Sequence, residues 1–275
     1  MAKKSIVFEK QSKYQKIQLA RQRGGLTLFL NGSPQVHSTE ERLYHETFAT
    51  LPLMLAKNVR SVLILGGGDG LALREVLRFP DVKQVTLVEL DAEVVKLCSN
   101  NSEWRKLTGD SLRDPRVKVV IGDGIEYMVN TRQKFDVIIH DLEDEFTTQP
   151  EPLSVELYQR FYFAIKNKLK PGGVWVMLVF GQENDLMLRE MYASYRENLP
   201  KKVQTEFMRK RGVIARTAVL LRTIFPTVRQ WTIDFPVLGK HCNFYMSDAP
   251  LNKIQRRPAG VLEHIGTGLP KELTR

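Results

Sequence analysis

The highest density of reactive side chains in the 275-residue sequence is an acidic run with four carboxylic acids within five residues, at Asp141, Glu143, Asp144 and Glu145. The run directly follows Phe135–His140, an apolar segment that predicts a buried strand. Carboxylates attract ammonium groups, and a carboxylate can also take a proton from an amine, which makes the amine a nucleophile. These residues therefore indicate a binding site for a multiply charged amine; a solvated acidic loop without a ligand is the alternative.

A glycine-rich loop at residues 66–70 follows the apolar run Ser61–Leu65. Its Gly66 and Gly68 allow a sharp turn and leave room for a ligand to approach the backbone. The loop also contains Asp69, whose charge would repel a pyrophosphate group. The loop therefore favours a nucleoside with a positively charged tail over a dinucleotide such as NAD.

Two more acids stand at the ends of later apolar runs. Glu89 lies 20 residues beyond Asp69, where a carboxylate can reach both hydroxyl groups of a ribose. Asp123 and Gly124 follow the next run, and the Asp123 carboxylate can accept a hydrogen bond from an adenine amino group. Because ligands of open parallel sheets bind at the carboxyl ends of the strands, we expect these acids to line one nucleoside site. Ordinary turn residues are the alternative.

The reactive residues need an alternating α/β order to bring them to one edge of a sheet. Continuous apolar runs predict five strands that are buried on both faces, at residues 61–65, 84–88, 117–121, 135–140 and 173–179. Helical segments are expected between them, at residues 71–78, 92–100, 125–129 and 155–169. This order predicts a Rossmann-like, mostly parallel sheet of the class I methyltransferase type.

The N-terminal part of the chain has a different pattern. Residues 5–37 combine short apolar runs with the turn signal Asn31–Pro34 and predict a small β domain. Residues 39–55 predict a helix, with Ser38 or Thr39 as its cap.

The C-terminal part is expected to add a helix and two strands, at residues 184–198, 228–233 and 242–247. A tail rich in proline and glycine follows and is expected to be loosely ordered. We predict an N-terminal β-hairpin domain with its connecting helix, a nucleotide-binding catalytic domain and a tail, at residues 1–55, 56–250 and 251–275.

Composition excludes several classes of protein. Hydrophobic residues make up 43% of the chain, which is enough for a sizeable core. No apolar run approaches 18 residues, so we expect no membrane contact and predict a cytoplasmic protein. Cys98 and Cys242 fit neither a disulfide framework nor a zinc site, and the histidines lack metal-ligand spacing, so no metal is expected.

The formal net charge of +10 is partly concentrated in residues 199–222, which hold seven basic residues and one acid, Glu206. Such a segment can attract an acidic partner. Phe207 is its only aromatic ring, however, so base stacking is not indicated and we do not expect nucleic acid as a partner. We predict a solvated or oligomer-contacting pair of helices here.

The chain resembles the polyamine aminopropyltransferases, the family of spermidine, spermine and thermospermine synthases, from about Phe8 to Ser247. The motifs that carry the resemblance are Tyr14-Gln15, Leu30-Asn31-Gly32, Tyr44-His45-Glu46, Gly66–Gly70, Val88–Asp91, Arg113–Arg116, Gly122–Gly124, Asp141–Asp144 and Lys170–Gly173. The resemblance implies transfer of an aminopropyl group from decarboxylated S-adenosylmethionine, as co-substrate, to a polyamine of the putrescine or spermidine type. It also implies methylthioadenosine as product, no prosthetic group, and a homodimer or homotetramer.

The resemblance further implies individual roles. Asp141 is expected to deprotonate the acceptor amine, and Tyr44 and Asp144 are expected to bind it. Asp69 would bind the ammonium of the aminopropyl tail, and Glu89 the ribose. The remaining expected nucleotide contacts are Gln15, His45, Gly66, Gly68, Asp123 and Gly124. Since Asp69 would repel the carboxylate of ordinary S-adenosylmethionine, the decarboxylated form is favoured.

Two departures from the family pattern leave the acceptor open. Glu145 stands where the family usually has a proline after the acidic loop, and Leu238 stands where it often has an acceptor-lining tyrosine. Two other functions also remain open. One is an S-adenosylmethionine-dependent methyltransferase on the same fold, and the other is a non-catalytic relative that binds the nucleotide or a partner.

Overall fold

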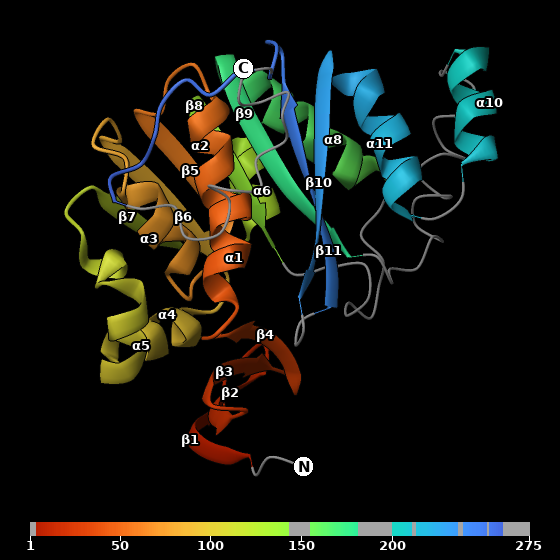
Figure 1. The fold of residues 1–275 in the computed structure, drawn as a ribbon. Helices are drawn as coiled ribbons and strands as arrows, with labels where there is room; N and C mark the ends of the chain where they lie inside the picture. Colours follow the sequence, from red (N-terminus) through yellow and green to blue (C-terminus); the bar gives the residue numbers. More distant parts are fainter. Residues whose placement is uncertain are drawn as a thin grey trace.

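The computed structural model describes residues 4–142, 155–180, 200–210, 213–235, 239–251 and 253–260. These residues form a four-stranded antiparallel sheet near the N-terminus and a seven-stranded, mostly parallel sheet covered by helices (Figure 1). The predicted Rossmann-like fold with a small N-terminal β domain is thereby confirmed. None of the described helices combines the length and the apolar character needed to cross a membrane.

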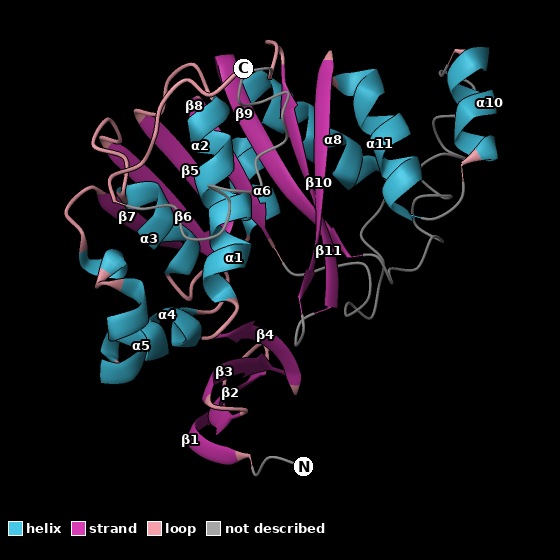
Figure 2. Ribbon diagram, viewed as in Figure 1, coloured by secondary structure: helices cyan, strands magenta, loops and turns pink. Residues whose placement is uncertain are grey.

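The small sheet contains β1 (Ser5–Gln11), β2 (Lys16–Gln22), β3 (Gly25–Leu30) and β4 (Ser33–His37), paired in that order. Two of its turns, Arg23-Gly24 and Asn31-Gly32, have positive φ at both residues, as tight hairpins require. The second is the turn that the sequence predicted. Apolar side chains of this sheet pack against α4 (Ala92–Asn100) and α5 (Ser102–Thr108), so the sheet is attached beside one end of the larger sheet (Figure 2).

The large sheet has the strand order β10-β11-β9-β8-β5-β6-β7. The five predicted parallel strands are confirmed as β5 (Ser61–Gly66), β6 (Gln84–Glu89), β7 (Val117–Ile121), β8 (Phe135–Asp141) and β9 (Leu169–Phe180). The two predicted C-terminal strands form an antiparallel pair, β10 (Thr227–Phe235) and β11 (Gly239–Ser247). The chain proceeds outward from β5 through β6 to β7 on one side and from β8 to β9 on the other, where β11 and the edge strand β10 complete the sheet. The strands β5 and β8 therefore form the switch point at which such sheets bind ligands.

Both faces of the large sheet are covered, which explains the continuous apolar strands. Along β5, Val62 and Ile64 pack with the helix at residues 41–55 and with α3 (Leu71–Leu77). The alternating residues Leu63 and Leu65 pack with the opposite layer, α6 (Gly124–Asn130), α8 (Val155–Lys168) and α11 (Val213–Ile224). Successive side chains of a strand point to opposite faces, so a strand between two helix layers must be apolar throughout.

The helix predicted at residues 39–55 is present as three consecutive stretches, α1 (Glu41–His45), the π-helix η1 (Glu46–Thr50) and α2 (Leu51–Leu55). The predicted caps Ser38 and Thr39 are wrong, because the residue before α1 is Glu40 and it makes no side-chain cap bond. Ser38 instead accepts a hydrogen bond from the backbone N–H of Leu26, at 3.0 Å. The Ser38 hydroxyl, which was expected to cap the helix, therefore bonds to β3 of the small sheet.

The structure differs from the sequence prediction in two further segments, neither of which has a regular pattern of apolar residues. The sequence did not predict α5, which buries Trp104 completely. The described part of the C-terminal tail is not loosely ordered, since Gln255 and Ala259 donate backbone hydrogen bonds to the carbonyls of Met54 and Arg78. The basic segment forms α10 (Lys201–Arg209) and α11. The helix expected at residues 184–198 lies outside the described residues, and the division into domains stays a prediction.

Candidate active site

The carboxyl ends of the parallel strands bring four predicted site residues to one rim of the sheet. Asp141, the last residue of β8, pairs with Gly66 at the end of β5, and Asp69 follows in the next loop. Glu89 ends β6, and Asp123 follows β7. The burial of Asp69, Glu89 and Asp141 is partial, and Asp123 is exposed. None of the four is sealed in the core, so they can serve one ligand at the switch point.

The glycine loop permits this close arrangement. Gly66 has a φ of +82°, and a Cβ atom there would lie 1.9 Å from the backbone oxygen of Asp141. A Cβ atom on Gly68 would lie 2.6 Å from Cγ of Glu89. Any side chain at either position would therefore displace a carboxylate or open the sheet. Gly66 makes the predicted sharp turn, and the approach of a ligand to either glycine stays a prediction.

Backbone amides hold the Glu89 carboxylate in place. Its two oxygens accept hydrogen bonds from the N–H groups of Gly68, at 3.0 Å, and Asp91, at 2.9 Å. Burial raises the pKa of Glu89, and these two bonds oppose the shift. A carboxylate oxygen has a second lone pair, so each oxygen can still accept a hydrogen bond from a ligand hydroxyl.

Asp69 is fixed through both its side chain and its backbone. Its Oδ1 accepts from the N–H of Leu71 at 2.7 Å, and its carbonyl accepts from the indole Nε1 of Trp104 at 2.8 Å. Burial raises the pKa of Asp69, while the neighbouring His45 lowers it. Trp104 was not predicted, because its role depends on a contact across 35 residues and no local pattern marks it.

Asp141 is a partly buried carboxylate with a raised pKa. The hydroxyl of Tyr44 donates to its Oδ1 at 3.2 Å. Burial raises the pKa of Asp141 to about 7, and the nearby negative charge of Asp69 adds to this effect. A carboxylate with a pKa near neutrality can take up a proton and release it within one catalytic cycle. Tyr44 and Asp141 thus lie in contact, and their roles toward the acceptor stay predictions.

Asp123 has a structural function that is visible in the structure. Its Oδ1 accepts from the N–H groups of Ile125 and Glu126 and so caps α6. Gly124 faces the side chain of Leu142, where a Cβ atom would lie 2.9 Å from the Leu142 Cδ2 atom. The turn-residue interpretation therefore accounts for part of what these residues do, and their contact with adenine stays a prediction.

The remaining predicted residues lie around this rim. Gln15 lies in the turn between β1 and β2 of the small sheet, and its Nε2 donates to Asp91 at 3.1 Å, two residues beyond Glu89 at the end of β6. His45 is only 1% exposed, and its Nδ1 lies 2.7 Å from the Glu41 carbonyl oxygen. Asp144, together with Glu143, Glu145 and Leu238, lies outside the described residues.

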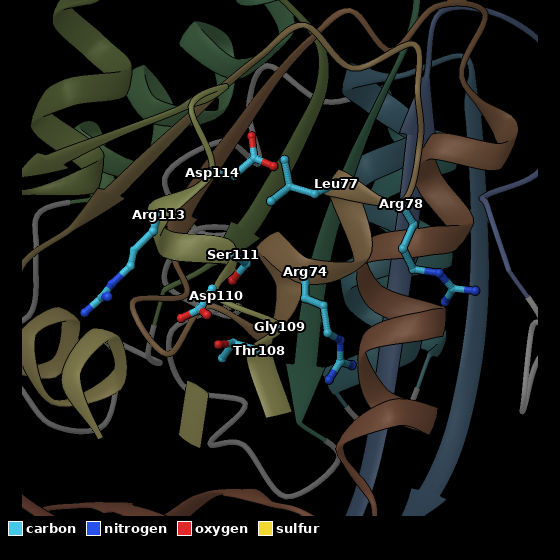
Figure 3. A pocket seen from close by; sticks show the side chains of 9 residues that line it. All are labelled: Arg74, Leu77, Arg78, Thr108, Gly109, Asp110, Ser111, Arg113 and Asp114. Carbon is cyan, nitrogen blue, oxygen red and sulfur yellow. The ribbon is translucent and has the colours of Figure 1, made fainter. Parts of the chain in front are cut away.

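A separate cavity of about 420 Å³ lies along α3 and the segment that follows α5 (Figure 3). Its lining includes Arg74, Leu77, Arg78 and Arg113, and none of the predicted site residues lines it. Arg74 lines the cavity, and its guanidinium also donates to the carboxylate of Glu41, which contacts His45. The cavity is therefore distinct from the rim of carboxylates but reaches its supporting residues.

The fold is that of a Rossmann-like α/β protein, and its partly buried carboxylates lie at the strand ends where such sheets bind ligands. Residues 41–244 match the family model described as the spermine/spermidine synthase domain. The chain belongs to this family.

Several curated relatives carry the name polyamine aminopropyltransferase. The protein from Oceanobacillus iheyensis is 36% identical over 194 residues, which cover 70% of this chain and 37% of that protein. The second such protein of Aquifex aeolicus is 36% identical over 198 residues, covering 71% of this chain and 38% of the relative. The protein from a Thermoanaerobacter species is 40% identical over 153 residues, covering 55% and 52%. The chain thus spans less than half the length of the first two relatives.

Solved structures agree on the fold. A spermidine synthase in complex with the transition-state analogue AdoDATO superposes with a TM-score of 0.70 at 24% identity, over 96% of this chain and 82% of that chain. The spermidine synthase of Thermotoga maritima superposes with a TM-score of 0.68 at 24% identity, over 96% and 81%.

Proposed function

We propose that this chain transfers the aminopropyl group of decarboxylated S-adenosylmethionine to a polyamine and releases methylthioadenosine. The observation that carries the proposal is the group of partly buried carboxylates at the switch point, Asp69, Glu89 and Asp141, whose pKa values are all raised. Their mutual repulsion is relieved by a cationic ligand, and both the donor and a polyamine are cations. The names of the curated relatives support the same reaction.

The donor is selected by charge. Glu89 would bind the ribose hydroxyls, with Gln15 and the Asp123–Gly124 turn completing the nucleoside site. Asp69 would bind the ammonium of the aminopropyl tail. Ordinary S-adenosylmethionine carries a carboxylate beside this ammonium, and two negative groups at that distance repel one another in a partly buried site. The decarboxylated donor lacks this group.

The reaction is a nucleophilic displacement. A polyamine arrives largely protonated, and Asp141 takes one proton from the attacking ammonium, so that its nitrogen gains a free electron pair. This pair forms a bond to the carbon next to the sulfonium, the carbon–sulfur bond breaks, and its electrons neutralise the sulfur. Methylthioadenosine leaves as a neutral thioether. Tyr44 orients Asp141 through its 3.2 Å hydrogen bond, and positioning of the two substrates supplies most of the acceleration.

Several finer points belong to the same proposal. The acceptor is a putrescine- or spermidine-type amine that Tyr44 and Asp144 bind. The protein works without a prosthetic group, in the cytoplasm, as a homodimer or homotetramer.

The test is incubation of the protein with labelled decarboxylated donor and each of putrescine, cadaverine, agmatine, spermidine and spermine. We expect a labelled product with at least one amine, and methylthioadenosine in equal amount. A thermal-shift comparison should rank the decarboxylated donor and methylthioadenosine above ordinary S-adenosylmethionine. Absence of product with every amine, together with an equal response to the carboxylated donor, would favour methyl transfer and refute the proposal.

A further inference from the structure

The π-helix η1 begins two residues after Tyr44, which contacts the proposed base. Short π-helical turns within α-helices are rare and often lie at functional sites. In this turn the N–H of Leu51 donates to the carbonyl of Glu46, five residues earlier. The next residue is Pro52, which has no N–H and cannot donate the next bond of this series to the carbonyl of Thr47. The Thr47 carbonyl therefore needs a donor from another part of the fold.

Strand β11 provides this donor. The hydroxyl of Tyr245 donates to the Thr47 carbonyl at 2.5 Å, and the Nδ2 of Asn243 donates to the Thr47 Oγ1 at 3.3 Å. Tyr245 and Asn243 are two residues apart on one strand, so their side chains point to the same face of the sheet. All three residues are at most 3% exposed. The C-terminal part of the sheet thus holds the π-helix through two buried hydrogen bonds.

The hydrogen bond from Tyr245 also explains why the turn is a π-helix. In an α-helix the N–H of Leu51 would donate to the Thr47 carbonyl, four residues earlier. Because the Tyr245 hydroxyl already satisfies that carbonyl, the N–H of Leu51 can bond to Glu46 instead. Without this hydroxyl, the buried carbonyl regains a donor when the turn shifts towards α-helical bonding. Such a shift moves the backbone before η1, which includes Tyr44, relative to α2.

Thr47 connects this anchor to the proposed base. The nearer of the two acceptors of its Oγ1 is the Tyr44 carbonyl, at 2.8 Å. The next residue of η1, Phe48, packs against the Tyr44 ring with 5.3 Å between the ring centroids. The Tyr44 hydroxyl in turn donates to Oδ1 of Asp141 at 3.2 Å. Contacts therefore run without a break from β11 through η1 to Asp141.

We infer that Tyr245 is a positioning residue, which holds η1 through the Thr47 carbonyl and thereby keeps the Tyr44 hydroxyl on Asp141. The inference rests on the proposed function, in which Asp141 is the base. It makes the active site depend on a strand that lies 198 residues beyond Thr47 in the chain.

The pKa of Asp141 reports on this arrangement. Burial and the charge of Asp69 in the glycine loop raise it, and Glu89 at the end of β6 adds a smaller effect. His45 and the hydrogen bond from Tyr44, both on α1, lower it. A hydrogen bond donated to a carboxylate favours its charged form. Loss of the bond from Tyr44 should therefore raise the pKa further, so that Asp141 ionises only at a higher pH.

The test is Tyr245→Phe, which removes the hydroxyl and keeps the ring in the core. NMR titration of isotope-labelled aspartate carboxyls in the ligand-free protein measures the pKa of Asp141, and Asp141→Asn identifies its signal. This pKa should rise by about one pH unit. The pH profile of kcat/KM for aminopropyl transfer should move with it, so that kcat/KM at about pH 7 falls about fivefold. Methylthioadenosine should bind within about twofold of wild type, since its proposed contacts lie on other elements.

Ser247→Ala is the matched control for a purely structural effect. The Ser247 hydroxyl is equally buried on β11 and also donates to a backbone carbonyl, that of Gly173 on β9, at 2.6 Å. Its loss should lower the melting temperature about as much as Tyr245→Phe does. The pKa of Asp141 and the pH profile of kcat/KM should stay as in wild type.

Further variants test the route through Tyr44. Thr47→Val removes the side-chain bond to the Tyr44 carbonyl and should raise the pKa of Asp141, whereas Thr47→Ser keeps the hydroxyl and should retain the wild-type value. The double variant Tyr44→Phe/Tyr245→Phe should have the same pKa of Asp141 as Tyr44→Phe alone. Once the Tyr44 hydroxyl is absent, the second change has no bond to Asp141 left to disturb.

The outcomes distinguish the inference from the proposed function. The inference is overturned by an unchanged pKa of Asp141 in Tyr245→Phe, by an equal rise in Ser247→Ala, or by a rise that adds to that of Tyr44→Phe. A wild-type protein that transfers no aminopropyl group to any amine would refute the proposed function. The NMR titration needs no turnover, so it decides the positioning of Asp141 in either case.

Discussion

Two groups of acids with different burial lie near α3, and their pKa values are shifted in opposite directions. At the rim, burial raises the pKa values of Asp69, Glu89 and Asp141. In the layer behind them, Glu41 and Glu75 are buried even more completely, yet their pKa values are lowered. The difference lies in the partners, because His45 and Arg74 bind Glu41, and Arg74 and Arg78 bind Glu75.

The comparison shows that pairing, not burial, decides whether a carboxylate in this protein is stabilised. The layer behind the rim contains its own cations and is complete as a structural element. Among the described residues of the rim, the carboxylates Asp69, Glu89 and Asp141 keep raised pKa values, which fits the cationic ligand of the proposed function. The consequences for stability have opposite signs. Glu41 contributes stability that is lost as the pH falls from about 4.5 towards 2, whereas ionisation of Asp141 costs stability as the pH rises from about 4 to about 7.

The largest effect is expected from Asp141→Asn, which removes the base from the rim. The turnover number should fall by a factor of about 10² to 10⁴, because general-base catalysis contributes this much. Binding of methylthioadenosine should stay within about threefold. Steady-state kinetics and calorimetry measure the two. In the wild type, kcat/KM should rise with pH through an apparent pKa of about 7. Turnover near the wild-type value in the variant would remove Asp141 from the mechanism.

The same substitution should stabilise the folded protein at high pH. Because ionised Asp141 is destabilising, its replacement by a neutral amide should add up to about 4 kcal/mol to the free energy of unfolding at pH 8. The gain should vanish near pH 4, where the wild-type carboxyl is protonated. Urea denaturation at both pH values checks this, and equal effects at the two would contradict the raised pKa.

Arg74→Met removes the cation that pairs with both Glu41 and Glu75 in the layer behind the rim. It leaves the buried acids Glu41 and Glu75 with too little positive charge, so the free energy of unfolding should fall by about 3–5 kcal/mol at pH 7.5. Arg113→Met is the matched control. Arg113 also lines the cavity of Figure 3, but it is exposed and donates to the Ser99 carbonyl, so its loss should cost less than about 0.5 kcal/mol. Equal losses of unfolding free energy in the two variants would show that the buried pairs of Arg74 contribute no more stability than an exposed arginine.

Asp69→Asn should weaken donor binding to an intermediate extent, and the loss should depend on the charge of the donor. Loss of a charge-assisted hydrogen bond of about 1.5–3 kcal/mol should weaken binding of the decarboxylated donor by about 10- to 100-fold. Ordinary S-adenosylmethionine should lose much less, because the variant also removes the repulsion of its carboxylate. Calorimetric titration with both donors gives the ratio of their dissociation constants. An unchanged ratio would mean that another residue selects the donor.

The smallest effect is expected from the basic helix α10. Lys201 and Lys202 are exposed, and screening at physiological salt limits their reach to about 8 Å. The double variant Lys201→Gln/Lys202→Gln should change the free energy of unfolding by less than about 0.5 kcal/mol and leave the KM of the amine unchanged. A KM that falls more than about threefold would show that the basic segment repels the substrate from the rim.

Much of the fold and part of the site follow from short-range patterns in the sequence. The five apolar runs predicted the parallel strands because a strand between two helix layers has no polar face. The glycine loop and the acids after the strands predicted the rim, since the carboxyl ends of parallel strands share one edge. The structure brings Tyr44 next to Asp141, across 97 residues, and the roles that the resemblance implies for both stay predictions. The contacts of Asp144 stay a prediction.

The sequence by itself determined the strand order along the chain, the turn at Asn31-Gly32 and the identity of the rim acids, because each depends on neighbouring residues. Only the tertiary structure decided which carboxylates are paired. Arg74 and Glu41 are 33 residues apart, and Trp104 reaches the Asp69 carbonyl from α5. No periodic pattern in the sequence predicts these contacts. They nevertheless decide which acids are paired and stabilise the fold, and which acids are left able to bind a cation.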